Sequence, residues 1–531
     1  MSWPADDELV SDILRDTSRR FADEPALLHQ SGWLTFADVD RLAAGLATEI
    51  RRLGATSGAR VVIYLDNGVA ARLADHAVLS SRFVRVALSS RLHPREAAAI
   101  ALDAMAPVVI CSPARTTDLT AALARVESSA RVLVLDDDTA TLGRLRDASD
   151  EVPDCRETRS DSSIMLMYSS GTTGQPKGVV VTDRTWTAQM RAAFSNLPEI
   201  THDDVVVLSA PMAHFGGSIA LDCMMRGART VIVEPFDPHR VLDAVETYGG
   251  TIVPLVPTLL SRLLDALPGR ESAVATVRAV PYGGSPAAVD VLVRATGFFP
   301  EALTQFYGLA EALAPLAVLS PEDHRVAAAH LTSDRTGSSA WRSRLQSAGR
   351  WVPGVEHRNV GGELLIRSET VMPRYWNRED LTASVLQDGW FLTGDYGHTD
   401  EEGYLHLLGR RSDTIITGGF NVRPREVERV IEQIDGIQDV AVIGLPDDRW
   451  GEGVHAFVVL DESSAAFPVD DVARVVREAC LERIASYKKP VGVHVLDRLP
   501  RNSFGKIDRT TLREHFLAST STDPTTDHER S

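Results

Sequence analysis

The feature that most limits the fold of this chain is an alternation of helical and strand-like segments in its N-terminal half. Residues 34–54 place apolar side chains at helical spacing, and 59–67 form a short β-branched run that ends in a turn. A second helical pattern followed by a strand occupies 95–112, and 131–137 is another strand. Strands that alternate with helices are typical of parallel sheets covered by helices. The sequence therefore predicts an α/β fold with sheets that are largely parallel.

The pattern continues through three further predicted strands at 205–211, 230–235 and 251–257. Near residue 413 the pattern of helices and strands changes, and the remaining segments are typical of a small α+β domain, here called the lid. These segments are a helix from Pro424 to about Ile434, strands at 440–445 and 455–461, and a helix at 470–484.

We expect three parts along the chain. A large N-terminal domain that binds the ligands covers 1–412, and the lid covers 413–517. Residues 518–531 are polar and rich in Thr and Ser, so they are predicted to be a disordered tail.

Length and charge exclude several functional classes. A chain of 531 residues is expected to form at least two cores. Its net charge of −18 argues against nucleic acid and against an anionic membrane surface as partners. No run of about twenty residues stays apolar, and the first ten residues lack the basic and apolar parts of a secretion signal. We therefore expect a cytoplasmic protein that binds neither nucleic acid nor membranes.

The cysteines fit the same expectation. None of the four has the spacing of a metal site or of a redox motif, so we expect reduced thiols. They are Cys111, Cys155, Cys223 and Cys480.

Lysine is rare in this chain. Of 55 lysine and arginine residues, only Lys177, Lys488, Lys489 and Lys506 are lysine. A sequence with this bias uses arginine wherever a positive charge suffices, whereas the planar guanidinium cannot replace a compact ammonium in a tight phosphate loop. Each lysine is therefore a candidate site residue. For Lys488 and Lys489, chance retention on the surface is an equal alternative.

The strongest motif is the segment 168–181, YSSGTTGQPKGVVV. Such a loop can surround phosphate oxygens with backbone N–H groups, and its lysine adds a positive point charge. It lacks the spacing of a Walker P-loop, and a surface turn between strands is the structural alternative. The predicted phosphate-binding residues are Ser169, Ser170, Gly171, Thr172, Thr173, Gly174 and Lys177.

This loop resembles the phosphate loop of adenylate-forming enzymes, a group that includes acyl- and aryl-CoA ligases, stand-alone adenylation domains and luciferases. The resemblance extends from about residue 20 to 516, because further family motifs follow in the family's order. They are the aromatic-Gly-x-x-Glu block at 307–311, Thr-Gly-Asp at 393–395, Gly-Arg-x-x-Asp at 409–413, a glycine pair at 418–419 and Gly-Lys at 505–506.

The resemblance implies a site for ATP or AMP and Mg²⁺. It makes Glu311 the Mg²⁺ ligand, since Mg²⁺ prefers carboxylate oxygen. It places Tyr307 against the adenine ring, and Asp395 and Arg410 on the ribose. It also implies that glycines let the backbone approach the base closely. The remaining nucleotide-binding candidates are Gly283, Gly284, Ser285 and Gly308.

The resemblance also implies a two-step reaction and a moving lid. Lys506 is the expected catalytic cation, because charge builds up on phosphate oxygens when a carboxylate attacks the α-phosphorus. Asp413 would be the hinge about which the lid rotates after adenylation, and Gly418 and Gly419 would line the acceptor channel then opened. In the fold, the large domain is expected to include a distorted barrel subdomain.

The block 211–217 resembles the family segment that borders the acid pocket. His214 is thus a candidate for the pocket and for catalysis, although a lone histidine is often structural. Relatives that activate amino acids carry an Asp shortly after this histidine, where Phe215 and Gly216 stand here, so an α-amino acid is disfavoured. We expect an aryl or a short-to-medium acyl acid. The other pocket candidates are Ser218, Tyr282, Gly308 and Ala312.

Three features depart from the family pattern. Ala310 stands where the family usually has Thr, which removes one hydrogen bond to phosphate, an effect of about 1 kcal/mol. Asp183 replaces a common His after the phosphate loop, and the hairpin at 355–367 is short. None of these changes removes Lys506 or Glu311, so activity is expected, but the acid and the acceptor stay open.

The leading hypothesis is an acid–CoA ligase that uses ATP, Mg²⁺ and CoA. The second is an adenylating enzyme with another acceptor, such as an amine or the thiol of a separate carrier protein, or with a small oxyacid such as nitrite. An inactive ATP-binding protein and a generic α/β binding protein are the alternatives without catalysis.

Overall fold

The computed structural model describes residues 4–5, 8–148, 161–169, 176–333, 338–417, 420–447, 450–461, 471–502 and 506–520. The chain divides into two compact units. The N-terminal unit consists of Met1–His357, Ile366–Phe391 and Thr399–His406, and the C-terminal unit consists of Arg358–Leu365, Leu392–His398 and Leu407–Ser531. The domain boundary predicted at residue 413 stays a prediction.

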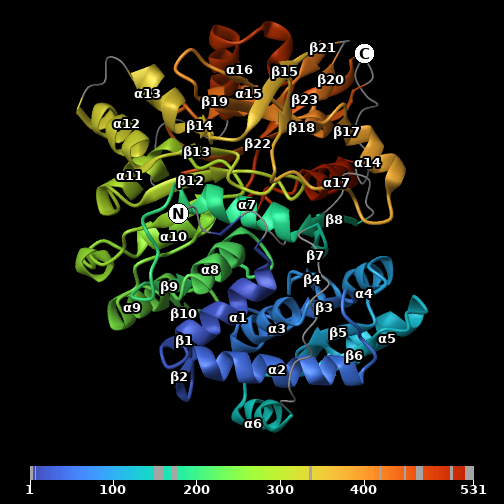
Figure 1. Ribbon diagram of the computed structural model, residues 1–531. Coiled ribbons are helices and arrows are strands. Elements are labelled where there is room, and N and C mark those ends of the chain that lie inside the picture. Colours follow the sequence, from blue (N-terminus) through green and yellow to red (C-terminus); the bar gives the residue numbers. More distant parts are fainter. Residues whose placement is uncertain are drawn as a thin grey trace. The chain divides into compact units, whose positions relative to one another are not determined.

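The largest sheet of the N-terminal unit has six strands in the order β6-β5-β3-β4-β7-β8. Strands β3 to β6 are parallel, as the alternating sequence pattern predicted, and β7 and β8 form an antiparallel hairpin. In Figure 1, α3, α4 and α5 lie beside these strands. The strands are β3 (Arg60–Tyr64), β4 (Val84–Ala87), β5 (Val108–Cys111), β6 (Arg131–Val134), β7 (Ser163–Ser169) and β8 (Lys177–Thr182).

The N-terminal unit contains two further mixed sheets, ordered β2-β1-β10-β9 and β11-β12-β13-β14. The sequence also predicted a strand at 251–257, and this was wrong. That segment makes only isolated bridges at Ile252 and Leu255, because its prolines lack the N–H groups of a continuous ladder. The strands are β1 (Pro25–His29), β2 (Gly32–Thr35), β9 (Val205–Leu208), β10 (Arg229–Ile232), β11 (Val280–Gly283), β12 (Leu303–Tyr307), β13 (Ala317–Leu319) and β14 (Arg350–Trp351).

Several helices of the N-terminal unit bury one apolar side, whereas α3 is buried on all sides. In α2, for example, Leu42, Leu46 and Ile50 are buried at intervals of four residues. This helix starts at Phe36 because Thr35 caps it: the Thr35 side chain accepts from the Asp38 amide at 3.1 Å. The helices are α1 (Val10–Arg20), α2 (Phe36–Arg52), α3 (Val69–Ser80), α4 (Pro94–Asp103), α5 (Thr116–Arg125), α6 (Thr139–Asp147), α7 (Asp183–Phe194), α8 (Phe215–Met225), α9 (Pro238–Tyr248), α10 (Pro257–Asp265), α11 (Val289–Phe298), α12 (Pro321–Ser333), α13 (Ser338–Leu345) and α14 (Glu379–Val385).

A five-stranded sheet has the order β15-β16-β18-β17, with β19 also paired to β18. Its residues are divided between the two units. The fold includes a half-barrel, where the family resemblance implied a distorted barrel. The strands are β15 (Glu356–Val360), β16 (Glu363–Arg367), β17 (Leu386–Gln387), β18 (Trp390–Thr399) and β19 (Leu405–Arg410).

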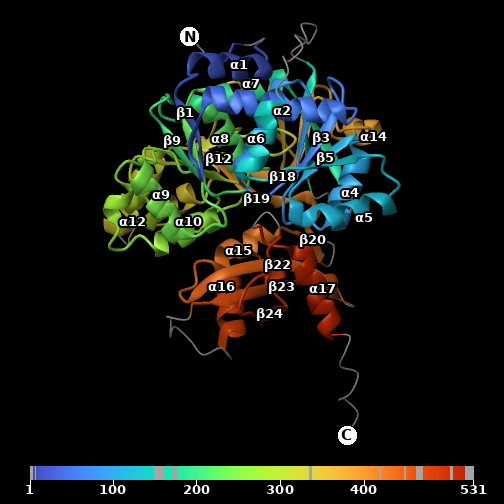
Figure 2. The same cartoon turned by 90° about the horizontal axis from the view of Figure 1, so that it is seen from below.

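The C-terminal unit contains a sheet ordered β21-β20-β23-β22, with β24 paired to β23. The helices and strands predicted for the lid are present, as Figure 2 shows. The tail prediction was wrong at its start, because α17 continues to Thr520; residues 521–531 lie outside the described residues. The elements are β20 (Ile415–Thr417), β21 (Phe420–Val422), α15 (Pro424–Ile431), β22 (Ile437–Asp447), β23 (Gly451–Leu460), α16 (Val472–Arg483), β24 (Gly492–Val495) and α17 (Arg509–Thr520).

The fold is therefore α/β, with a large N-terminal part and a small α+β C-terminal part, as predicted. Cys111, Cys223 and Cys480 are buried free thiols, and Cys155 lies outside the described residues. None of the described helices is long and apolar enough to cross a membrane.

Candidate active site

The predicted phosphate loop is the connection of the β7–β8 hairpin. Lys177 is the first residue of β8 and pairs with Ser169, the last residue of β7. Next to it, Gly178 is closely packed, since a Cβ there would lie 3.1 Å from the Tyr168 ring. The predicted residues Ser170, Gly171, Thr172, Thr173 and Gly174 lie outside the described residues.

The segment 370–376, here called the strap, runs along the free edge of β8. Tyr375 forms an antiparallel bridge with Val179, and the Trp376 amide donates to the Gly178 carbonyl at 2.7 Å. The strap thereby adds backbone pairing to the strand that begins at Lys177.

The same strap holds the turn that carries Glu311. The Met372 amide donates to the Glu311 carbonyl at 2.8 Å, and Ala312 bridges to Val371. The Tyr375 hydroxyl donates to Oε1 of Glu311 at 3.0 Å. A half-buried carboxylate held in this way offers hard oxygen ligands in one orientation, which fits a Mg²⁺ ion. One strap thus contacts both the phosphate-loop strand and the predicted metal ligand.

The loop end of strand β7 is anchored to α4. The Tyr168 hydroxyl donates to Oδ2 of Asp103 at 2.6 Å, and Arg378 donates to Oδ1 of the same carboxylate at 2.5 Å. Burial and the neighbouring Asp103 raise the pKa of Tyr168 above its ordinary value, so the phenol stays protonated and keeps donating. Asp103 thus ties the hairpin to the residues that follow the strap.

The predicted adenine-side residues lie at the ends of two parallel strands. Gly283 ends β11 and pairs with Phe306 of β12, and Tyr307 ends β12. A Cβ on Gly283 would come within 2.5 Å of the Phe306 carbonyl oxygen, and Gly284 has φ +87°. Both positions therefore require glycine. The carboxyl ends of parallel strands are the usual place for a ligand in α/β sheets.

The turn between Tyr307 and Glu311 is also tightly packed. A Cβ on Gly308 would meet Cα and Cβ of Ala314 at 2.5 and 2.6 Å. Leu309 and Ala312 exchange backbone hydrogen bonds of 2.9 and 3.3 Å, and Ala312 is fully buried. The backbone of this turn is therefore fixed, although Ala310 offers no hydroxyl.

Of the predicted acid-pocket residues, Phe215 is brought to the strand ends. Its ring lies edge-on to Phe306, with centroids 5.9 Å apart at 83°. Its Cζ lies 3.8 Å from where a Cβ on Gly283 would stand. His214 directly precedes α8, and its carbonyl accepts from the Ser218 amide at 3.0 Å.

The structure does not bring the Tyr282 side chain to this group. Successive residues of a strand face opposite sides, so Tyr282 and Gly283 cannot both face Phe215. The Tyr282 hydroxyl lies 2.7 Å from Nε2 of His324, and its ring is fully buried in a separate core cluster. Ser285 is half-buried after Gly284.

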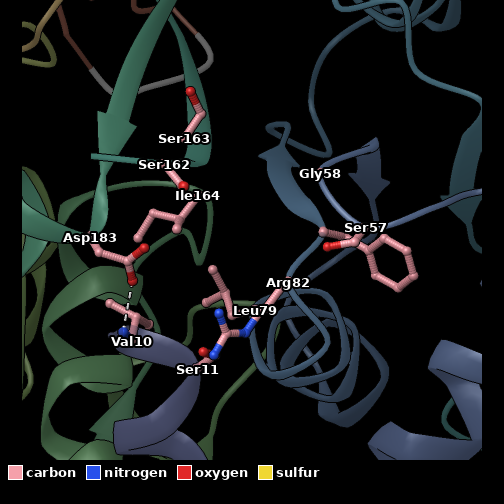
Figure 3. Close-up of a pocket in the computed structure, with 11 residues that line it drawn as sticks. Val10, Ser11, Ser57, Gly58, Leu79, Arg82, Ser162, Ser163, Ile164 and Asp183 are labelled. Carbon is pink, nitrogen blue, oxygen red and sulfur yellow. Dashed lines mark hydrogen bonds between the residues drawn. The ribbon is translucent and has the colours of Figure 1, made fainter. Parts of the chain in front are cut away.

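Asp183 lies at the other end of the hairpin from the phosphate loop. It is the first residue of α7, and its Oδ1 accepts from the Val10 amide at 2.8 Å. Its side chain lines a cavity of about 240 Å³, together with Ser11 and Arg82 (Figure 3). Burial raises the pKa of Asp183 to about 7. This departure from the family pattern therefore lies away from the predicted site residues.

The C-terminal unit holds the remaining predicted residues. Asp395 is buried, and its Oδ1 lies 3.1 Å from Nε of Arg410. The preceding Gly394 has φ +70°, and its amide donates to Oε1 of Glu363 at 3.2 Å. Gly418 and Gly419 lie outside the described residues.

Lys506 lies three residues before α17 begins at Arg509. Its amide donates to Oδ1 of Asn502 at 3.1 Å, and its carbonyl accepts from the Asn502 amide at 2.8 Å. Arg509 follows in α17, with Nη1 4.0 Å from Oδ2 of Asp413, the predicted hinge. Lys488, by contrast, forms a salt bridge with Glu426. This salt bridge gives Lys488 a structural role.

Sequence reasoning missed Tyr375 and Asp103. The sequence offered only an aromatic pair, Tyr375–Trp376, and an acidic residue at a helix end. Neither carries a spacing that points to phosphate or metal.

Two family profiles match this chain. The family profile described as AMP-binding enzyme matches residues 14–376, and the profile of the AMP-binding enzyme C-terminal domain matches residues 426–506. The first match lies within the predicted N-terminal domain and the second within the predicted lid.

Individual proteins are similar over nearly the whole chain. A long-chain-fatty-acid–CoA ligase of Mycobacterium tuberculosis is 31% identical over 489 residues, covering 92% of this chain and 94% of its own. A feruloyl-CoA synthase of Amycolatopsis is 33% identical over 498 residues, covering 92% and 96%. The structure of the amide bond synthetase McbA from Marinactinospora thermotolerans matches with a TM-score of 0.80 and 27% identity, covering 95% and 99%.

Proposed function

This chain belongs to the family of AMP-binding enzymes, and we propose that it adenylates a carboxylic acid with ATP and transfers the acyl group to the thiol of CoA. In the first step, a carboxylate oxygen attacks the α-phosphorus and pyrophosphate leaves. In the second, the thiol sulfur attacks the acyl carbon, loses its proton, and AMP leaves. The observation that carries the proposal is the strap, which joins the strand of Lys177 to the carboxylate of Glu311.

Within the N-terminal unit, each proposed site residue has a role that suits the chemistry of its side chain. A bound Mg²⁺ would neutralise charge on the phosphate oxygens. Glu311 would hold the ion through carboxylate oxygen, and Lys177 would add a fixed positive charge beside the phosphates. Tyr307 would pack on the adenine, with Gly283 and Gly284 allowing the backbone to approach.

The C-terminal unit would supply the ribose contacts and the catalytic cation. Asp395 would accept hydrogen bonds from the ribose hydroxyls, with Arg410 donating to the same sugar. Lys506 would stabilise the charge that develops when the carboxylate attacks phosphorus. Asp413 would be the hinge between the two steps.

We propose that the acid is an aryl or a short-to-medium acyl acid. Phe215 and Phe306 offer an apolar, aromatic wall beside Gly283. Neither carries a carboxylate that could form an ion pair with an α-ammonium group, so the wall disfavours amino acids. The CoA ligases to which the chain is similar support CoA as the acceptor.

A pyrophosphate-release assay with ATP and Mg²⁺ tests this function. The panel holds aryl, aminoaryl, short-chain and medium-chain acids and nitrite, each with and without CoA. We expect one class of organic acid to trigger release and CoA to accelerate it, with the acyl-CoA identified by mass spectrometry. If CoA does not change the rate of pyrophosphate release, the proposal that CoA is the acceptor is wrong. If no acid triggers release, the proposed adenylation is wrong.

An amine acceptor is the second candidate function. It is favoured by the likeness to an amide bond synthetase, which has 27% identity and a TM-score of 0.80. The same assay with a panel of amines in place of CoA separates the two. Amide product without thioester product would select this second function.

A further inference from the structure

The hydroxyl of Tyr375 contacts Glu311 from a fixed position. Its ring is buried, with 5% exposed. Its own amide donates to Oγ1 of Thr382 at 3.0 Å, and its backbone bridges to Val179 of β8. The hydroxyl therefore reaches Glu311 from a residue that is held on both sides.

A hydrogen bond to one carboxylate oxygen restricts how Glu311 can point. A glutamate side chain loses rotamer entropy when it is ordered. With Oε1 bonded to Tyr375, much of that ordering is complete before a ligand binds. Two carboxylate oxygens offer about four acceptor positions in total, so coordination sites stay open.

Magnesium makes this orientation important. Mg²⁺ demands nearly ideal octahedral geometry and tolerates misplaced ligands poorly. Partners that hold a ligand in place typically contribute 10- to 100-fold to metal affinity.

The turn itself does not need this hydroxyl. The Met372 amide already donates to the Glu311 carbonyl, and the Leu313 amide donates to the Thr370 carbonyl at 3.1 Å. These backbone bonds hold residues 311–313 on the strap. Removing the Tyr375 hydroxyl therefore changes the side chain of Glu311 more than the path of its backbone.

We propose that Tyr375 is a positioning residue that orients Glu311 toward the divalent cation bound with ATP. The proposal rests on the proposed function, in which Glu311 is the metal ligand. Tyr375 touches neither the nucleotide nor the ion in this role and acts through the carboxylate alone.

Direct metal binding tests the proposal without turnover. Mn²⁺ is titrated into the full-length enzyme with ATP and no acid, and free Mn²⁺ is read from its electron paramagnetic resonance signal. The variants are Tyr375→Phe, Glu311→Gln and the double variant. Tyr404→Phe is the matched control, because it also removes a buried hydroxyl–carboxylate bond, to Asp323 at 2.5 Å, but touches no predicted site residue.

We expect Tyr375→Phe to weaken Mn²⁺ binding about tenfold and Glu311→Gln to weaken it at least as much. The double variant should bind no more weakly than Glu311→Gln alone, since Tyr375 acts through that carboxylate. Tyr404→Phe should bind as the parent does.

The outcomes distinguish a failure of the positioning role of Tyr375 from a failure of the proposed function. If Glu311→Gln binds Mn²⁺ normally, the metal-ligand assignment in the proposed function is wrong. If Glu311→Gln binds weakly but Tyr375→Phe binds normally, only the positioning role is wrong. Additive losses in the double variant would also overturn it, because they would mean that Tyr375 acts independently of Glu311.

Discussion

Arg509 donates a hydrogen bond from Nη2 to Oε1 of Glu428 over 2.6 Å. Glu428 lies in α15 with 2% of its surface exposed, and the same oxygen accepts from the Val442 amide at 2.9 Å. Since Arg509 begins α17, this contact fixes the start of the helix three residues after Lys506.

Replacing Arg509 with methionine should therefore destabilise the C-terminal unit by about 3 kcal/mol, because it leaves a buried carboxylate without its closest cation. Hydrogen exchange of α17 amides would report the loss. Arg513→Met on the same helix is the control. Its contact with Glu452, at 3.6 Å, is partly exposed and should cost less than about 1 kcal/mol. Similar losses in both variants would contradict this role of Arg509.

Lys506→Ala should lower acid-dependent pyrophosphate release by about 100-fold or more, because it removes the cation proposed to meet the developing charge. The contacts between Lys506 and Asn502 should survive, since Lys506 makes them through its amide and carbonyl. ATP binding, measured by calorimetry, should change little. Lys489→Ala serves as the control for loss of a lysine. Normal adenylation in Lys506→Ala would disprove the assignment.

Asp413→Pro should slow thioester formation far more than adenylation, because proline restricts the rotation expected at a hinge. Single-turnover measurements of the two steps would separate them. Asp413→Ala, which keeps backbone freedom, should have the smaller effect on the second step. Equal slowing of both steps by proline would count against a hinge at this position.

Gly308→Ala should destabilise the N-terminal unit by about 1–3 kcal/mol, because the new Cβ would lie 2.5 Å from Cα of Ala314. It should also raise the KM for ATP by shifting the turn before Glu311. Gly297→Ala is the control, since nothing lies within 4 Å of its Cβ position in α11. Alanine there should be neutral or stabilising. Urea denaturation of both variants checks the difference, and equal stabilities would refute the packing argument.

Asp183 should make stability depend on pH. Burial raises its pKa to about 7 in the folded protein, whereas an unfolded aspartate titrates near 4. The folded state therefore holds the proton more tightly, so this contribution is fully present below about pH 4 and is lost as the pH rises toward 7. Arg82 and Asp12 face the same carboxyl.

Asp183→Asn should remove this dependence while still accepting from the Val10 amide. Between pH 5 and 7, the free energy of unfolding of the parent protein should fall, relative to that of Asp183→Asn, by roughly 1 kcal/mol per pH unit. Urea unfolding at several pH values measures the difference. Parallel pH profiles would show that Asp183 does not titrate as proposed.

The sequence alone determined the elements whose signals lie within a few neighbouring residues. The alternating pattern at 34–137 specified parallel strands and helices, because apolar periodicity depends on local geometry. The motif at 168–181 specified the family, which the profiles confirm. The roles of Lys506, Glu311 and Asp395 stay predictions.

Tertiary structure alone decided which distant side chains meet. Tyr375 reaches Glu311 across 64 residues of sequence, and Asp183 meets Val10 across 173. Tyr282 is turned from Phe215 by strand alternation, although the sequence grouped them. Such contacts depend on how whole elements pack. A local pattern fixes the side of a helix or strand that is buried, but it does not specify the neighbour that covers it.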